Sequence, residues 1–345
     1  MRGVWERLIA ELDPDHDPLP GAAEMATAAL DGGLAAPLPG LGILHVAGDD
    51  AGAFLHNQLT QAVDGLPADQ TCLAAWCNAK GRAHAVLRVV PSDTGLVLIG
   101  DAAVIEAIRP KLQRFILRAQ VALTDISDSE GLLGLAGPVA ESLLEETAGS
   151  LPRSDNALVR AGDLHVIRIP GGETRRYLLL APAEQLGALW QRYCLSLTRA
   201  DEAFWQLLDI RAGLPQITAA TMEAFVPTML NLEPLGGISY EKGCYPGQEV
   251  VARMHYLGRL KRRLYRARLA DDPPPPGTSV NDDRGNEAGT VVTAALAPTG
   301  GSELLAVLRI DAANAGQLDV DGSPLALLDL PYPPPGEPTE APPSA

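Results

Sequence analysis

The spacing of hydrophobic and polar positions predicts short strands interspersed with amphipathic helices. Alternating or continuous apolar runs predict strands at 41–46, 71–76, 84–90, 96–99, 132–136, 164–169 and 176–180. Helical spacing of apolar side chains predicts helices at 49–61, 104–115, 184–195 and 202–211. The strands at 71–76 and 84–90 flank the turn-rich tetrapeptide 78–81, which predicts a hairpin. Because the elements do not follow a regular βαβ alternation, the pattern predicts an α+β body.

The pattern changes at the proline run 273–276. Short strands such as 289–295 and 304–310 follow it with almost no helical spacing, which predicts a small C-terminal β-barrel or sandwich. Before the body, the segment 13–21 is acidic and proline-punctuated, as disordered segments are, and Met25 is an alternative candidate for the translation start. We therefore expect a flexible N-terminal extension at 1–34, a body at 35–255, a β-barrel at 256–332 and a disordered proline-rich tail at 333–345.

Composition and charge limit the classes of function. Hydrophobic residues make up 46% of the 345 residues and charged residues 20%, which is typical of globular proteins. There is no apolar run of about 18 residues and no signal-peptide core near the start, so we expect a cytoplasmic protein without a membrane partner. Four cysteines are too few for a disulfide scaffold. The sequence also has no dinucleotide or P-loop motif and no zinc motif, so we expect no metal site.

The net charge of −16 argues against nucleic-acid binding by the whole surface, but one stretch departs from this acidity. The basic strip at 253–268 has seven basic residues and no acidic one: Arg253, Arg259, Lys261, Arg262, Arg263, Arg266 and Arg268. It is either a strand edge kept soluble by charge or a cradle for an anionic ligand, such as a polyglutamylated folate tail or an RNA backbone.

The segment 242–249, Lys-Gly-Cys-Tyr-Pro-Gly-Gln-Glu, carries the strongest chemical signal. Gly243 and Gly247 permit backbone angles that other residues resist, so the chain can expose Cys244. Lys242 adds a positive charge that would stabilise a thiolate, the reactive form of cysteine. We therefore expect Cys244 to be the functional thiol and Lys242 to be its electrostatic neighbour.

The residues after the cysteine support two interpretations. Gln248 and Glu249 can hydrogen-bond backbone groups of the loop, either to shape a binding site or simply to rigidify the turn. Arg253 is expected to contact an anionic group, or to pair with Glu249 if a helix begins there.

The segment 242–249 resembles the hallmark motif of the YgfZ-type folate-binding proteins, which are relatives of the glycine-cleavage aminomethyltransferase, or T-protein. The segments 48–60, 74–82 and 205–253 are also similar to this superfamily, and the resemblance spans about 41–332. It implies an aminomethyltransferase-like fold, a ring of three parts around a central hole in which tetrahydrofolate can sit.

The resemblance also implies roles for individual residues. The catalytic carboxylate of the T-proteins falls at about Ala85, whose methyl group cannot transfer a proton, so aminomethyl transfer is not expected. Trp205 matches a folate-binding tryptophan, where an indole can stack on a pterin, unless it only fills the core. A second folate-binding aromatic of the family falls at Leu41. The remaining expected folate-binding residues are Tyr245, Gln248, Glu249 and Arg253.

Three functions follow from these observations. The leading hypothesis is a tetrahydrofolate-binding accessory factor for assembly or maintenance of iron–sulfur enzymes, including tRNA-modifying ones, whose partners are iron–sulfur client or scaffold proteins. One alternative is a folate-dependent one-carbon transferase. The other is an RNA- or protein-binding module that uses the basic strip, with tRNA as a possible partner.

Overall fold

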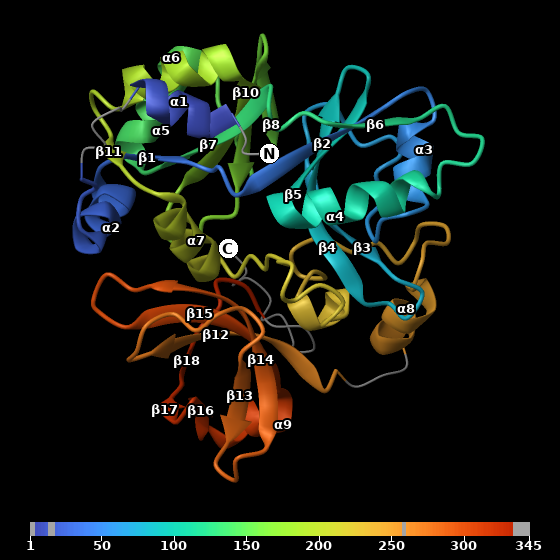
Figure 1. The fold of residues 1–345 in the computed structure, drawn as a ribbon, viewed down its shortest axis with the longest axis vertical. Helices are drawn as coiled ribbons and strands as arrows, with labels where there is room; N and C mark the ends of the chain where they lie inside the picture. The colour runs from blue at the N-terminus through green and yellow to red at the C-terminus, as the bar shows by residue number, and fades with distance from the viewer. Residues whose placement is uncertain (1–3, 13–17, 257–259, 334–345) are drawn as a thin grey trace, which may run out of the picture.

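The computed structural model describes residues 4–12, 18–256 and 260–333, and these form three units that meet at a common centre (Figure 1). Each unit is built on one sheet, with six, five and seven strands respectively. The predicted α+β architecture and the predicted C-terminal barrel are both confirmed.

The first unit has a sheet with the strand order β11-β1-β7-β10-β9-β8. Its pairs are antiparallel except β1 with β11, and a cluster of buried apolar side chains packs between the sheet and its helices. The strands are β1 (Leu34–Pro37), β7 (Glu130–Ala136), β8 (Leu158–Ala161), β9 (Leu164–Ile169), β10 (Arg176–Pro182) and β11 (Thr198–Arg199), and the helices are α1 (Val4–Leu12), α2 (Ala22–Asp31), α5 (Pro138–Ala148) and α6 (Ala183–Tyr193).

The second unit is an antiparallel sheet with the order β3-β4-β5-β2-β6, and α4 packs against three of its strands. The predicted hairpin is present, with β3 and β4 joined by the turn at 78–82. The elements are β2 (Leu41–Ala47), α3 (Ala51–His56), β3 (Cys72–Cys77), β4 (Ala83–Ser92), β5 (Gly95–Asp101), α4 (Ala102–Gln113) and β6 (Ala122–Asp125).

The third unit is the barrel-like sheet with the order β17-β16-β13-β14-β15-β12-β18, which encloses its own apolar cluster. Its elements are β12 (Arg262–Leu269), β13 (Ser279–Asp282), β14 (Glu287–Leu296), β15 (Ser302–Arg309), α9 (Ile310–Ala315), β16 (Leu318–Val320), β17 (Ser323–Pro324) and β18 (Ala326–Leu328). Three helical elements lie between the units: α7 (Glu202–Arg211), the 3-10 helix η1 (Pro227–Leu230) and α8 (Gln248–Tyr256). Helix α7 packs on β14 and β15 and so ties the barrel to the centre.

The described part of the N-terminal segment differs from the flexible extension expected at 1–34. Trp5 of α1 is 1% exposed, donates its indole N–H to the Leu132 carbonyl at 2.6 Å and packs edge-on against Trp190. Met25 and Ala29 of α2 are buried as well. The segment is therefore integrated into the first unit, because its apolar side chains complete that unit's core. The expected disorder at 13–17 and in most of the tail at 333–345 lies outside the described residues.

Buried ionic groups lie where the first two units meet. The Arg176 side chain of β10 is fully buried, and its Nη1 lies 2.7 Å from Asp209 Oδ1 of α7. Arg88 of β4 donates to Thr71 and, across the boundary, to Asn156 at 2.8 Å. Because a buried charge is costly without a partner, this network fixes how the two units meet. Across the described ranges, no helix is both long enough and apolar enough to span a bilayer.

Candidate functional site

The loop that carries Cys244 packs directly on the hairpin turn of the second unit. Gly247 has a φ of 81°, and a Cβ built on it would lie 2.5 Å from Gly81 Cα and 2.6 Å from the Asn78 carbonyl oxygen. Gly81 has a φ of 72° and faces Val250 in the same way. Only glycine allows both this backbone conformation and this approach, so the pair Gly81–Gly247 joins two segments that are distant in sequence.

Gly243 does not have the role expected of it. A Cβ built on Gly243 meets no atom within 4 Å, and its φ lies outside the left-handed range. Of the two motif glycines, only Gly247 is therefore required by the backbone.

Lys242 holds the motif loop to the end of α3. Its ammonium donates to three backbone carbonyls, those of His56, Leu59 at 2.6 Å and Gln61 at 3.0 Å. The His56 carbonyl is at the C-terminus of α3, where carbonyls lack intrahelical partners and carry partial negative charge, so a cation is favourable there. Lys242 Nζ also lies 5.2 Å from the centre of the Tyr245 ring.

These contacts change the electrostatic role expected of Lys242. Burial lowers the pKa of its ammonium to about 8, and the nearby Cys72 side chain on β3 partly opposes this shift. Burial raises the pKa of the Cys72 thiol to about 12, so Cys72 stays protonated at neutral pH. Lys242 therefore acts on Cys244 by positioning the loop, since its own donors are directed to carbonyls.

Cys244 is exposed, as the motif predicted. The next residue, Tyr245, is 6% exposed, and burial raises the pKa of its phenol. One side chain of the loop thus anchors it while the adjacent thiol faces solvent. Of the four cysteines, Cys244 is the exposed one, whereas Cys77 is buried and the other two are half-buried.

The three polar residues after the loop lie on or at the start of α8. Gln248 donates to the Lys242 carbonyl at 3.5 Å, which folds the loop back as expected. The helix does begin at Gln248, so Glu249 and Arg253 share one face four residues apart, and both are exposed. This placement allows either an ion pair or an anion contact, and it puts neither residue at Trp205.

A cavity of about 320 Å³ opens beside Trp205, within the size range of small-molecule sites, about 300–1,000 Å³. Helix α7 supplies half of its lining, and the rest comes from the start of β2, the end of β5 and the segment after α7. The lining residues are Gly40, Leu41, Asp101, Glu202, Ala203, Trp205, Gln206, Asp209, Gln216 and Thr218. The structure therefore brings together Trp205 and Leu41, the two positions that correspond to folate-binding aromatic residues of the family.

Stacking of a ligand on the broad faces of Trp205 is not available. The indole is 3% exposed, and a Cβ on Gly134 would lie 2.6 Å from its ring atoms, so the Gly134 backbone covers one face. The Arg176 guanidinium lies 5.0 Å from the ring centre. The indole is part of the central core, which is the alternative role considered for Trp205, and it also borders the cavity. A ligand can therefore contact its edge.

Three carboxylates of the cavity were not identified from the sequence. Glu202, Asp209 and Asp101 all line it. Glu202 accepts a hydrogen bond from the Gly40 amide at 2.8 Å, and burial raises its carboxyl pKa to about 7, with nearby carboxylates adding to the effect. Burial also raises the pKa of Asp101, against the Val104 amide that its side chain caps. The concentration of acids flanking Trp205 in 201–209 was the available signal.

The raised pKa of Glu202 predicts a stability change with pH. Between about pH 4.5 and 7 the folded state binds a proton that the unfolded chain releases, so stability should fall as pH rises through this window. Glu202→Gln keeps an acceptor for Gly40 without the charge. We expect the variant to be about 2 kcal/mol more stable than wild type at pH 8 and similar to it below pH 5, in urea unfolding. Equal stability differences at both pH values would contradict a raised pKa.

Cys244 and its neighbours do not line this cavity. Over the described ranges, the lining contains no residue of 242–249. The thiol loop and the Trp205 cavity instead both contact the second unit, the loop through the hairpin turn beneath Gly247 and the cavity through Asp101 at the end of β5. The expectation that Tyr245, Gln248, Glu249 and Arg253 contact a ligand at Trp205 therefore has no geometric support.

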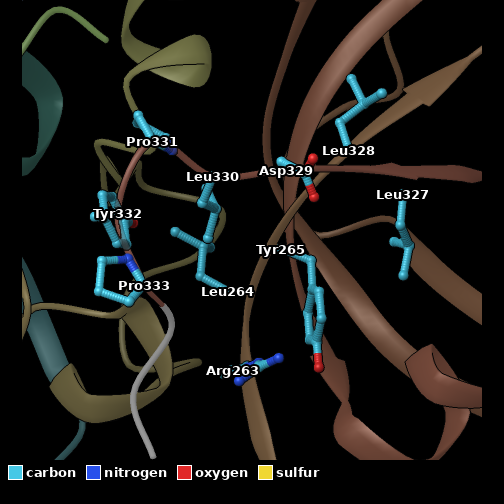
Figure 2. Close-up of a pocket in the computed structure, with 10 residues that line it drawn as sticks. All are labelled: Arg263, Leu264, Tyr265, Leu327, Leu328, Asp329, Leu330, Pro331, Tyr332 and Pro333. Atoms are coloured by element: carbon cyan, nitrogen blue, oxygen red, sulfur yellow. The ribbon is translucent and has the colours of Figure 1, made fainter. Parts of the chain in front are cut away.

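Two larger cavities run along the C-terminal segment instead. One, of about 580 Å³, lies between β12 and residues 327–333, with Tyr265 to one side and Tyr332 to the other (Figure 2). Tyr332 closes it against the centre by donating to the Gly213 carbonyl at 2.7 Å. The other, of about 640 Å³, includes Arg211 and Arg266, which both bind the buried Glu303. Neither is lined by Trp205 or by the motif.

The basic strip at 253–268 does not form a single free cationic surface. Arg266 pairs with Glu303 at 2.6 Å, Arg262 lies 3.5 Å from Glu287, and Arg268 donates to the loop at 299–300. Arg259 lies outside the described residues. Much of this charge therefore serves the barrel's own packing. The described ranges also hold no group of three or more residues able to bind a metal ion.

Comparison with known proteins agrees with this geometry. The structure of the glycine cleavage system aminomethyltransferase T from Bartonella henselae superposes with a TM-score of 0.75, at 16% identity, covering 90% of this chain and 89% of that one. The fold is therefore that of the aminomethyltransferases. A family described as "CAF17, C-terminal beta-barrel domain" matches residues 261–335, which include the barrel.

Sequence relatives identify the family. The tRNA-modifying protein YgfZ of Yersinia enterocolitica is 33% identical over 299 residues, which cover 84% of this chain and 89% of that protein. The tRNA-modifying protein YgfZ of Colwellia psychrerythraea is 34% identical over 224 residues, covering 65% and 68%. The chain belongs to the YgfZ family of tRNA-modifying proteins.

Proposed function

We propose that this protein binds tetrahydrofolate in the Trp205 cavity and supports iron–sulfur enzymes that modify tRNA, with Cys244 as its functional thiol. The observation that carries the proposal is the cavity itself, since it unites Trp205 and Leu41 in a fold shared with the aminomethyltransferases. The tRNA-modifying relatives supply the link to tRNA modification.

The chemistry of the cavity suits a reduced pterin. The pyrimidine edge of a pterin presents an amino group and a ring N–H, which are hydrogen-bond donors. The carboxyl groups of Glu202, Asp101 and Asp209 offer acceptors, and Gln206 and Gln216 can both donate and accept. A site of this kind holds a flat ligand by its polar edge and leaves the Trp205 edge for an apolar contact.

The exposed thiol of Cys244 is suited to transient interaction with a partner protein. A single cysteine cannot hold an iron–sulfur cluster, so further ligands would have to come from a client or scaffold protein. The Cys244 loop is anchored by Lys242, Tyr245 and Gly247, which present the thiol on a fixed base. Such preorganisation lowers the entropy lost when a partner docks.

Replacing Cys244 by alanine tests this role. In cells that lack the native protein, we expect Cys244→Ala to restore less than about a tenth of the activity of an iron–sulfur tRNA-modifying enzyme that wild type restores. Its free energy of unfolding should stay within about 0.5 kcal/mol of wild type, because the side chain is exposed. Cys194→Ala, in the first unit, is the control and should restore full activity. Full activity of Cys244→Ala would refute a role for the thiol.

One observation favours a second function, a folate-dependent one-carbon transferase. Ala85 is fully buried on β4 and offers no acid, but Glu202 places a carboxyl group with a pKa of about 7 in the cavity. A group that exchanges its proton near neutral pH can act as a general acid or base. Turnover of a methylamine donor with tetrahydrofolate, lost in Glu202→Gln, would establish this alternative.

A further inference from the structure

The end of α4 and the loop after it are basic and apolar on an acidic protein. Residues 109–118 contain four basic residues and no acidic one, whereas the whole chain has a net charge of −16. Arg114 and Arg118 are exposed. Between them, Phe115 is 48% exposed and Leu117 is 87% exposed. Exposed apolar side chains between exposed arginines are unusual for a surface that only faces water.

The Phe115 ring is held in place from below. It meets Trp76 of β3 edge-on, with ring centres 6.2 Å apart and planes at 85°. Trp76 is itself 2% exposed and packs on His84 at 4.6 Å. Phe115 therefore offers a partly exposed aromatic ring on a rigid support, which costs little conformational entropy when a flat group stacks on it.

The hairpin turn adds cations to the same surface. Lys80 and Arg82 are exposed, and Arg82 donates to the Ala224 carbonyl. Lys111 Nζ, on α4, lies 4.0 Å from the sulfur of Met222, two residues before Ala224 in the chain. We call this set, Lys80, Arg82, Lys111, Arg114, Phe115 and Arg118, the α4–hairpin surface.

The acid inside this surface is already engaged. Glu223 accepts from the Asn78 amide at 2.8 Å and lies 3.2 Å from His84 Nδ1. It adopts a φ of 62°, a strained conformation for a residue other than glycine, so its position is fixed by these contacts. Its charge is therefore partly compensated, and the five cations of the surface exceed it.

We propose that the α4–hairpin surface binds single-stranded RNA. Cations that follow a backbone together with an aromatic ring for base stacking are the two features that single-strand sites share. Repulsion by the acidic remainder of the chain confines a polyanion to such a local surface. The basic strip is a weaker candidate, because Arg262 and Arg266 are paired with carboxylates of the barrel.

The position of this surface couples it to the thiol. The turn that carries Lys80 and Arg82 is the same turn that packs on Gly247 of the Cys244 loop. An RNA strand on the α4–hairpin surface would thus lie next to the loop that presents Cys244. The inference goes beyond the folate proposal and does not depend on it.

Fluorescence anisotropy with a labelled oligouridine of about 12 nucleotides tests the proposal, at about 50 and 200 mM salt. Wild type should bind at the lower salt and weaken at the higher. The double variant Arg114→Ala/Arg118→Ala should lose at least about tenfold in affinity, and its salt slope should fall by about 1.4, the change for two phosphate contacts. Phe115→Ala should lose roughly tenfold with an unchanged slope, as expected for one stack.

The matched control is Arg262→Ala/Arg263→Ala, which removes the same charge from the basic strip and should keep wild-type affinity. Circular dichroism and thermal unfolding establish that each variant is folded, and tetrahydrofolate titration should be unchanged in all of them. No binding by wild type at low salt would overturn the proposal. Equal losses of affinity in the two double variants would also overturn it. Wild-type RNA affinity in Arg114→Ala/Arg118→Ala would overturn it as well, and would indicate that this surface binds a protein partner instead of RNA.

Discussion

Gly247→Ala is expected to destabilise the protein by about 2–4 kcal/mol, although it adds one methyl group. The left-handed backbone at this position costs an alanine about 1–2 kcal/mol. The new Cβ would also lie 2.5 Å from Gly81 Cα, so the loop must move away from the hairpin turn. Urea unfolding at pH 7 measures the loss.

Gly243→Ala provides the matched control within the same motif. Nothing lies within 4 Å of its added Cβ, and its φ is not left-handed. The substitution should therefore be neutral or stabilising by a few tenths of a kcal/mol, through the unfolded chain. Equal stability of the two alanine variants would contradict the close packing of the motif loop on the hairpin turn.

Asp209→Asn is expected to be the second large effect, a loss of about 2–4 kcal/mol. The change leaves the fully buried Arg176 without a counter-charge, and breaking a buried pair by removing one partner is costly. Arg176 Nε is buried without a hydrogen-bond partner in the structure, so loss of the Asp209 charge would leave the guanidinium even less compensated. The Asp209 side chain is 32% exposed, so water screens the pair in part. The expected loss of stability is therefore smaller than for a fully buried ion pair.

Asp93→Asn is the control for this effect. Its pair with Arg160 is 2.8 Å long, close to that of Asp209 with Arg176, but the Asp93 side chain is 93% exposed. Screening by water should limit its loss to less than about 1 kcal/mol. Similar losses in the two variants would mean that burial does not govern the Arg176–Asp209 pair.

Local patterns in the sequence predicted the elements well. The hairpin at 72–92, the strand at 41–47 and the helix at 202–211 follow from apolar spacing and turn residues, which act over a few positions. The helix predicted at 49–61 ends at His56. Asp50 occupies the N-cap position of this helix, but its side chain accepts from the Gln120 amide, a partner 70 residues away, and does not cap the helix.

The sequence of the N-terminal helix carries two opposing signals. Val4, Trp5, Leu8, Ile9 and Leu12 recur at helical spacing, which predicts one apolar face. The acidic, proline-rich stretch after them instead predicts disorder. Composition describes whether a segment can fold alone, whereas α1 folds on the surface offered by α6 and β7.

The site was predictable in its residue types but not in its contacts. The exposure of Cys244 followed from the motif. The partners of Lys242 lie more than 180 residues earlier in the chain, so no spacing within the motif could reveal them. The cavity carboxylates are equally non-local, since Asp101 ends β5 while Glu202 begins α7. The separation of the thiol from the Trp205 cavity likewise required the tertiary fold.

Calorimetric titration with tetrahydrofolate is the most direct test of the central claim, that the Trp205 cavity binds this ligand. Ala203 is exposed on α7 and lines the cavity, so Ala203→Trp should fill it without disturbing the core. Ala188→Trp, at an exposed position on α6, is the control. We predict saturable binding by wild type and Ala188→Trp, and at least about a hundredfold loss, near 3 kcal/mol, in Ala203→Trp. Undiminished binding by Ala203→Trp, or no binding by wild type, would contradict the account.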